Sequence, residues 1–134
     1  MRMTGGCLCG GLRYVIEGAP SFAGYCCCAD CRKASGSGFV GFMGVDAGRV
    51  RFRGEARAFA SPAAGGRVAV RNFCPVCGGL VYGGTIGVDG FHTVYAGSLD
   101  DAAGFRPTMA IFLRDKPEWV VLPEGLVLFD TMPA

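Results

Sequence analysis

Eight cysteines, gathered in three short groups, constrain this chain more than any other feature of its sequence. Residues 1–6 contain no apolar stretch, so we expect no signal peptide and a cytosolic protein. Cysteines in a reducing compartment bind metals or carry out catalysis more often than they form disulfides. We therefore expect metal sites that join distant parts of one chain. The groups are Cys7-Leu8-Cys9, Cys26-Cys27-Cys28-Ala29-Asp30-Cys31 and Cys74-Pro75-Val76-Cys77.

The third group is a zinc knuckle in which Cys74 and Cys77 offer two thiolates from one tight turn. Gly78-Gly79 leaves the backbone room to turn its N–H groups toward the sulfurs. Cys7 and Cys9 are two residues apart, so on a strand they share a face. We expect these four cysteines to form one closed structural zinc site. Two unrelated knuckles, or buried free thiols, are the alternative.

The middle group predicts a second and different zinc site. Cys26 and Cys28 share a strand face, Cys27 points away, and Cys31 completes a Cys-x-x-Cys pair with Cys28. Three thiolates and an open fourth position are typical of a catalytic zinc, which we expect to be held more weakly and to be partly occupied. The spacing supports equally a second structural site with a distant fourth ligand, such as His92 or an aspartate.

The rest of the sequence predicts one mainly β domain over residues 1–134, built from short antiparallel strands and stapled by zinc. The apolar fraction of 51% argues against disorder, and the 23 scattered glycines favour many tight turns. One helical turn is expected at 29–35, and strand 56–60 is expected to pair with strand 49–53 across the Gly54-Glu55 corner. The expected strands are 12–17, 22–28, 38–45, 49–53, 56–60, 67–73, 80–82, 91–96, 109–113 and 126–129.

The net charge and the single histidine argue against several classes of function. A net charge of +2, from 13 basic and 11 acidic residues, does not favour binding to nucleic acid or to an anionic membrane. No stretch is long and apolar enough to span a bilayer. His92 lies in a strand-like context, which favours a β histidine that is either hydrogen-bonded or exposed over a ligand or a general base. Cys–His and Ser–His–Asp catalysis therefore have little support.

Several motifs follow one another in an order that is found in a known family. They are Gly6-Cys7-Leu8-Cys9-Gly10-Gly11-Leu12-Arg13-Tyr14, Cys26-Cys27-Cys28-Ala29-Asp30-Cys31-Arg32-Lys33-Ala34-Ser35-Gly36-Ser37, Phe73-Cys74-Pro75-Val76-Cys77-Gly78, and Gly97-Ser98-Leu99-Asp100-Asp101 with Phe105-Arg106-Pro107 and 116–119. In this order the sequence resembles the glutathione-dependent formaldehyde-activating enzyme family, which also includes the domain of centromere protein V. The resemblance covers nearly the whole chain.

This resemblance implies a β-tent fold and two zinc sites divided as described above. It also implies the reaction class of S-(hydroxymethyl)glutathione synthase, a carbon–sulfur lyase that joins glutathione to formaldehyde. The family usually has histidine at the position of Cys27 and another near Ala110, and both are replaced here.

The expected mechanism is activation of a thiol. Zinc held by Cys26, Cys28 and Cys31 would deprotonate the incoming thiol, whose thiolate then adds to a small aldehyde. Arg32 and Lys33 stand beside these ligands and are expected either to offset the surplus negative charge of the site or to hold a glutathione carboxylate, with an ordinary exposed turn as the alternative. A non-enzymatic, zinc-stabilised protein-binding module of the same fold is the rival hypothesis, because fold does not fix function.

Overall fold

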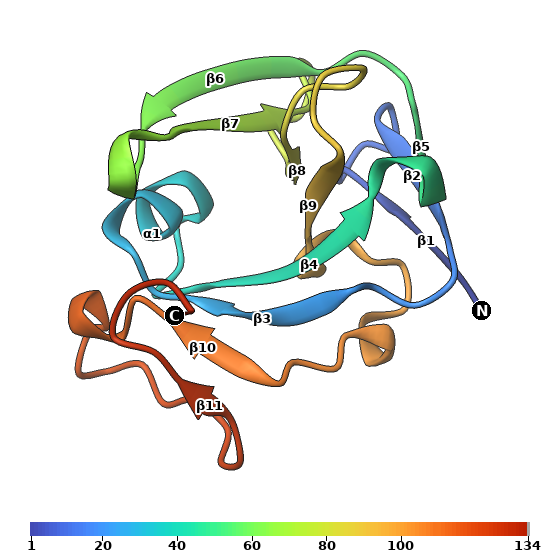
Figure 1. Cartoon of the computed structure of the whole chain (residues 1–134). Helices are drawn as coiled ribbons and strands as arrows, with labels where there is room; N and C mark the ends of the chain where they lie inside the picture. The colour runs from blue at the N-terminus through green and yellow to red at the C-terminus, as the bar shows by residue number, and fades with distance from the viewer. Residues whose placement is uncertain (134) are drawn as a thin grey trace.

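Strands dominate the computed structural model, which describes residues 1–133 (Figure 1). The strands are β1 (Arg2–Gly6), β2 (Arg13–Glu17), β3 (Phe22–Cys26), β4 (Val40–Asp46), β5 (Val50–Arg53), β6 (Arg57–Pro62), β7 (Val68–Phe73), β8 (Leu80–Gly83), β9 (Phe91–Tyr95), β10 (Met109–Ile111) and β11 (Val127–Leu128). The helix α1 (Ala29–Ser35) and the 3₁₀ turns η1 (Ala47–Arg49), η2 (Ala64–Gly66), η3 (Ala96–Ser98), η4 (Ala102–Gly104) and η5 (Leu113–Asp115) lie between them. The prediction of a mainly β protein is confirmed.

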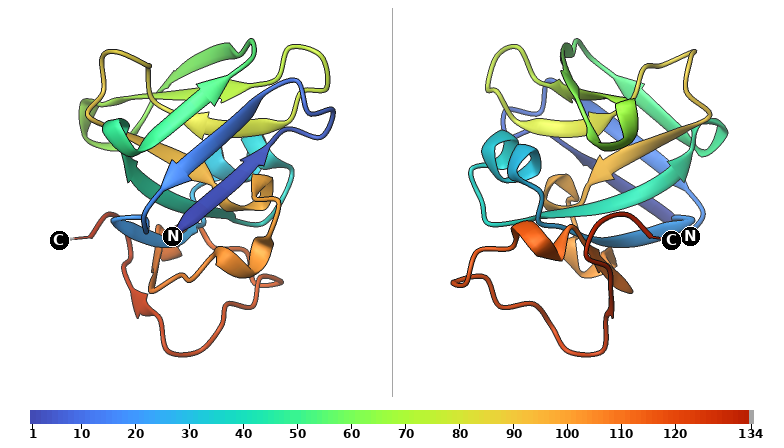
Figure 2. Two further views of the ribbon diagram at one scale, coloured as in Figure 1. Left: turned by 90° about the vertical axis from the view of Figure 1, so that its right-hand side faces the viewer. Right: turned by 60° about the vertical axis from the view of Figure 1, so that its left-hand side comes forward.

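The strands form two sheets. The smaller sheet has the order β1-β2-β5, and the larger has the order β11-β10-β3-β4-β9-β8-β7-β6. Within residues 1–133, no helix has the length and apolar character needed to cross a membrane. Figure 2 shows that the chain between η5 and β11 makes a long loop away from both sheets before it returns to pair with β10.

The predicted pairing of strand 56–60 with strand 49–53 is wrong. β5 pairs with β2 in the smaller sheet, whereas β6 pairs with β7 in the larger one, with Ala58 opposite Asn72. Between them Gly54 has φ 98°, and a Cβ there would lie 1.9 Å from the carbonyl oxygen of Gly11. This close approach carries the chain out of one sheet and into the other, so no hairpin forms at this corner.

Most of the strand pairs are antiparallel, as expected, but one strand is an exception. β10 runs parallel to both β3 and β11. Most of the chain separates β3 from β10, so the connection is long enough for the parallel arrangement, which a tight hairpin does not allow.

The main core lies between the two sheets and follows the side-chain alternation of the strands. On β2, Tyr14 and Ile16 point inward and are almost fully buried. β4 is central in the larger sheet and is buried nearly throughout, with Met43 and Val45 wholly inaccessible. Apolar contacts between β2 and β4 thus fix how the sheets stack, since burying each such side chain contributes about 1.5–3 kcal/mol.

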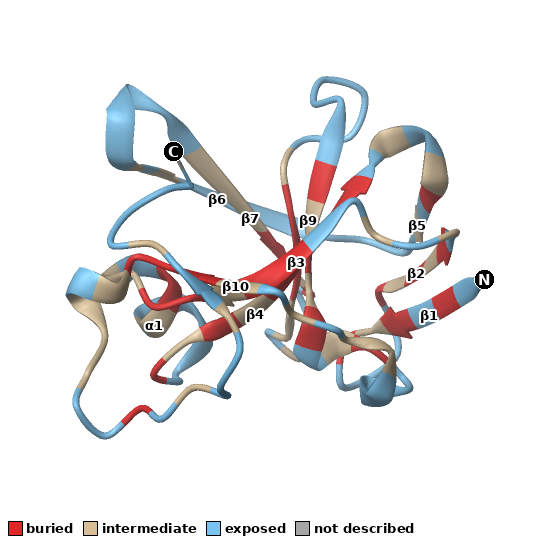
Figure 3. Cartoon of the chain, turned by 60° about the horizontal axis from the view of Figure 1, so that its bottom comes forward, coloured by how far each residue is buried: buried red, intermediate tan, exposed pale blue. Residues whose placement is uncertain are grey.

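The β6–β7 hairpin differs from the rest of the larger sheet. Nearly every residue of β6 is exposed, as the pale blue ribbon in Figure 3 shows. The hairpin lacks a second layer over most of its length, so one of its faces is free to form a cavity wall. A second apolar cluster, separate from the main core, forms around Cys26, Phe42 and Ile111.

Candidate metal centres

The first cysteine cluster joins the loop after β1 to the loop after β7. The Sγ atoms of Cys7, Cys9, Cys74 and Cys77 all lie within 4.8 Å of one another. The Cys7–Cys9 and Cys9–Cys74 sulfur distances are 3.7 and 3.6 Å. Four thiolates placed tetrahedrally around zinc at about 2.3 Å would be about 3.8 Å apart. The donors and their spacing therefore fit one four-coordinate ion such as zinc.

Backbone N–H groups around this cluster point at the sulfurs. The Leu12 N–H donates to Cys7 Sγ at 3.2 Å. The Val76 and Cys77 N–H groups approach Cys74 Sγ at 3.4 and 3.5 Å. Such contacts stabilise a thiolate and fix its direction. The turn that makes them possible is closed by a hydrogen bond from Gly78 N to Cys74 O.

The thiols of this cluster do not ionise together. The N–H groups of Cys9 and Gly79 lower the pKa of Cys77 to about 6. The Gly11 N–H lowers the pKa of Cys9, but the sulfurs of Cys74 and Cys7 outweigh it and raise that pKa to about 11. A cation is therefore needed to hold all four as thiolates near neutral pH.

The second cluster lies where β3 ends and α1 begins. The Sγ atoms of Cys26, Cys28 and Cys31 lie within 4.8 Å of one another, and no other His, Cys, Asp or Glu side chain within residues 1–133 joins them. Cys28 caps the helix, because its sulfur accepts a hydrogen bond from Cys31 N at 3.3 Å. The helix ends at Gly36, which has φ 72°. The predicted helical turn and its three-thiol group are both present.

Cys27 is outside this group. It is fully buried, and its N–H donates to the carbonyl of Ile111 on β10 at 3.1 Å. Burial raises the pKa of the Cys27 thiol. The regular strand ends at Cys26, yet the chain keeps Cys26 and Cys28 together and turns Cys27 into the interior.

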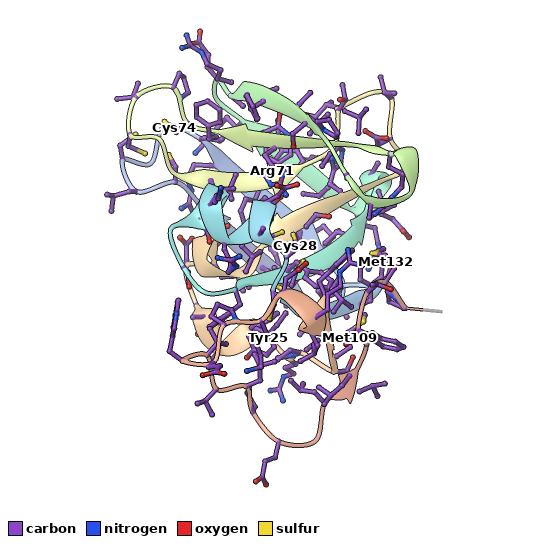
Figure 4. The ribbon with its side chains drawn as sticks, turned by 90° about the vertical axis from the view of Figure 1, so that its left-hand side faces the viewer. Tyr25, Cys28, Arg71, Cys74, Met109 and Met132 are labelled. Atoms are coloured by element: carbon purple, nitrogen blue, oxygen red, sulfur yellow. The ribbon has the colours of Figure 1, made fainter. Side chains whose placement is uncertain are left out.

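A cavity of about 450 Å³ opens beside the second cluster. Its wall includes the three clustered cysteines, and the hairpin contributes Ala69 and Arg71 of β7. Figure 4 shows Arg71 and Cys28 close together on one side of the molecule. The aromatic lining is Phe22, Phe42, Phe91, Tyr95 and Phe112, and the charged lining is Asp30, Arg67, Arg71, Arg114 and Asp115.

The three thiols of the second cluster differ in how readily they ionise. Hydrogen bonds from the thiols of Cys26 and Cys31 lower the pKa of Cys28 to about 2. The positive charge of Arg71 acts in the same direction, although less strongly. Cys26 shares its proton with these neighbours, so its own pKa is raised. The positively charged guanidinium of Arg71 therefore lies beside this group of thiols.

Arg71 was not singled out by the sequence. Its Nη2 lies 3.6 Å from Cys31 Sγ, and its Nη1 donates to Ser61 Oγ at 3.3 Å. No spacing rule connects a β7 residue to cysteines 40 positions earlier in the chain. Neither Arg32 nor Lys33 lines the cavity, so their role as substrate contacts stays a prediction.

The single histidine belongs to neither cluster. His92 is buried, and its Nδ1 donates to the carbonyl oxygen of Gly83 at 2.8 Å. Its ring packs edge-on against Phe52 and Tyr82. The interpretation of His92 as a hydrogen-bonded β residue is confirmed.

Comparison with known proteins adds one family and one related structure. The sequence model of a family described as glutathione-dependent formaldehyde-activating enzyme matches residues 2–115. No curated protein is significantly similar to the chain. A crystal structure of a Rhodobacter sphaeroides protein resembles this fold with a TM-score of 0.55 and 22% identity, over 95% of this chain and 99% of that chain. That likeness supports the fold alone.

Cys77→Ser should produce insoluble or largely unfolded protein. The first cluster joins two loops that are far apart in sequence, and structural zinc contributes about 10 kcal/mol or more to the folding of small peptides. Circular dichroism and metal content would be measured on the soluble fraction. Val76→Ser is the matched control, because Val76 lies on the same loop and is exposed. A folded Cys77→Ser protein with full zinc and an unchanged melting temperature would contradict the assignment.

Cys27→Ala should keep its full metal content, whereas Cys28→Ala should lose the ion of the second site. Of these two adjacent residues, Cys28 has its sulfur in the three-thiol group and Cys27 does not. Metal stoichiometry of the two purified proteins, measured by mass spectrometry, is the test. Equal loss of metal from both variants would show that Cys27 is also a ligand, and this description of the second site would be withdrawn.

Proposed function

Because the chain belongs to the glutathione-dependent formaldehyde-activating enzyme family, we propose that it joins a small thiol, such as glutathione, to a small aldehyde, such as formaldehyde. The same site would catalyse the reverse cleavage, which makes the protein a carbon–sulfur lyase resembling S-(hydroxymethyl)glutathione synthase. The observation that carries this proposal is the group of three thiols that forms part of the wall of a cavity.

We assign zinc to both clusters, with a structural role for the first and a catalytic role for the second. Sulfur donors of this number and spacing suit zinc better than calcium or magnesium, which prefer oxygen ligands. An ion held by Cys26, Cys28 and Cys31 would lower the pKa of a substrate thiol enough to keep it as the thiolate. The absence of a fourth ligand among residues 1–133 favours this enzyme over the closed site expected of a protein-binding module.

The cavity supplies the surroundings that this chemistry needs. Its aromatic side chains make the surroundings of the reacting atoms less polar than bulk water, which strengthens electrostatic interactions there. Arg67 and Arg114 make the cavity suitable for an anionic thiol such as glutathione. We retain Arg32 and Lys33 as proposed contacts for any part of the thiol that extends out of the cavity along α1. Eight free cysteines also fit our proposal of a cytosolic location.

The proposed reaction is the addition of a thiol to the carbonyl group of an aldehyde. The thiol first loses its proton to solvent, and a sulfur lone pair then forms the new bond to the carbonyl carbon. The π electrons of the carbonyl group move onto its oxygen, which takes a proton from water. The product is a hemithioacetal, and the reverse sequence releases thiol and aldehyde.

Exchange NMR spectroscopy on purified, zinc-loaded protein tests the proposal. With glutathione and formaldehyde, the protein should accelerate interconversion between the free and adduct forms above the rate in buffer. Cys28→Ala should show only the buffer rate, because it loses a ligand of the second site. Cys27→Ala serves as the matched neighbour and should stay active. Wild-type protein that does not exceed the buffer rate with any of a panel of thiols and aldehydes would favour the binding module instead.

A further inference from the structure

Arg71 differs from the other two arginines of the cavity. Arg67 is exposed and donates to the Ala64 carbonyl, while Arg114 is 55% exposed and pairs with Asp115. Arg71 is only partly exposed and forms no salt bridge with a carboxylate among residues 1–133. Its Nε is buried without a hydrogen-bond partner. A buried donor without a partner is costly, so this N–H is available to an acceptor that enters the cavity during function.

The surrounding strands hold the Arg71 guanidinium in the cavity wall, beside the three sulfurs. Ser61 on β6 accepts from Nη1, while Nη2 lies 3.6 Å from Cys31 Sγ. Gly83 on β8 lies directly opposite Arg71 in the sheet. With no side chain at this position, nothing from β8 separates Arg71 from the cavity-lining residues of β9.

Tyr95 of β9 places a second hydrogen-bond donor, its hydroxyl group, near Arg71. It lines the cavity, and its hydroxyl lies 3.6 Å from where a Cβ at Gly83 would be. Burial raises the pKa of Tyr95 to about 12, against the opposing effect of the Arg71 charge. The hydroxyl is therefore protonated at neutral pH and can donate a hydrogen bond into the cavity.

We propose that Arg71 and Tyr95 form an oxyanion site, in which both side chains donate hydrogen bonds to the aldehyde oxygen as it gains negative charge. The proposal rests on the function proposed above. When the thiolate sulfur bonds to the carbonyl carbon, the π electron pair moves onto the oxygen between these two donors. That oxygen then takes its proton from water. In cleavage the hydroxyl returns the proton to water, and the same donors stabilise the alkoxide that expels the thiolate.

The position of Arg71 favours this role over binding of a remote carboxylate. Its guanidinium contacts Cys31, one of the three proposed zinc ligands, so it lies next to the place where the substrate thiol would react. Fixed donors aimed at a developing oxyanion contribute more to the rate than to substrate affinity. The competing role, in which Arg71 only balances the charge of three thiolates, predicts instead that its removal weakens metal binding.

Four variants separate these roles. Arg71→Gln removes the charge and most of the donors, Arg71→Lys keeps the charge but loses the planar fork, and Tyr95→Phe removes one hydroxyl. Arg51→Gln is the control, because Arg51 is exposed on β5 in the other sheet. For each protein, melting temperature, zinc content, calorimetric affinity for glutathione, and kcat and KM for the adduct reaction would be measured.

We expect Arg71→Gln to keep its zinc and its affinity for glutathione while kcat falls by about 100-fold. Arg71→Lys should recover part of this loss, Tyr95→Phe should lower kcat with unchanged metal content, and Arg51→Gln should match wild type. Loss of zinc from Arg71→Gln, or a raised KM with unchanged kcat, would overturn the proposal. If Arg71→Gln does not fold, an unchanged kcat in Tyr95→Phe would overturn it as well. Inactive wild-type protein would instead remove the proposed function, and this inference with it.

Discussion

Four thiols meet where the end of β1 approaches the end of β7. These strands belong to different sheets, and the four sulfurs connect them. Neighbouring thiols oppose one another's ionisation, so a cation has to be present for all four to act as thiolates. The cluster and the apolar contacts between β2 and β4 therefore set the relative position of the sheets together.

The first cluster also affects the second cluster, because strand β7 leads from one to the other. Cys74 follows the last residue of this strand, and Arg71 lies three positions earlier on it. The ion that ties down the end of β7 would thus also hold the guanidinium beside Cys31. The facing wall comes from β3, β4 and α1, and the three thiols lie at the end of β3, at the N-cap of α1 and within α1. Strand β7 therefore connects the proposed structural centre with the proposed catalytic centre, although the two share no ligand.

The sequence predicted the features that local spacing controls. Two-residue alternation and the Cys-x-x-Cys pattern grouped the cysteines as the structure has them, and the strand patterns predicted most of the strands. Longer-range features were missed. The Gly54 corner looks like a hairpin turn until the close approach of Gly11 is known. Arg71 and Tyr95 reach the cavity only through the order of strands β7, β8 and β9, which no motif encodes.

Zinc K-edge X-ray absorption spectroscopy on the purified protein tests most directly whether a closed and an open site coexist. We expect two populations of zinc, one bound by the four sulfurs of the first cluster and one by the three sulfurs of the second with an oxygen from water. Adding glutathione should replace that oxygen with sulfur. Two closed sites, with spectra that glutathione does not change, would contradict an open catalytic position.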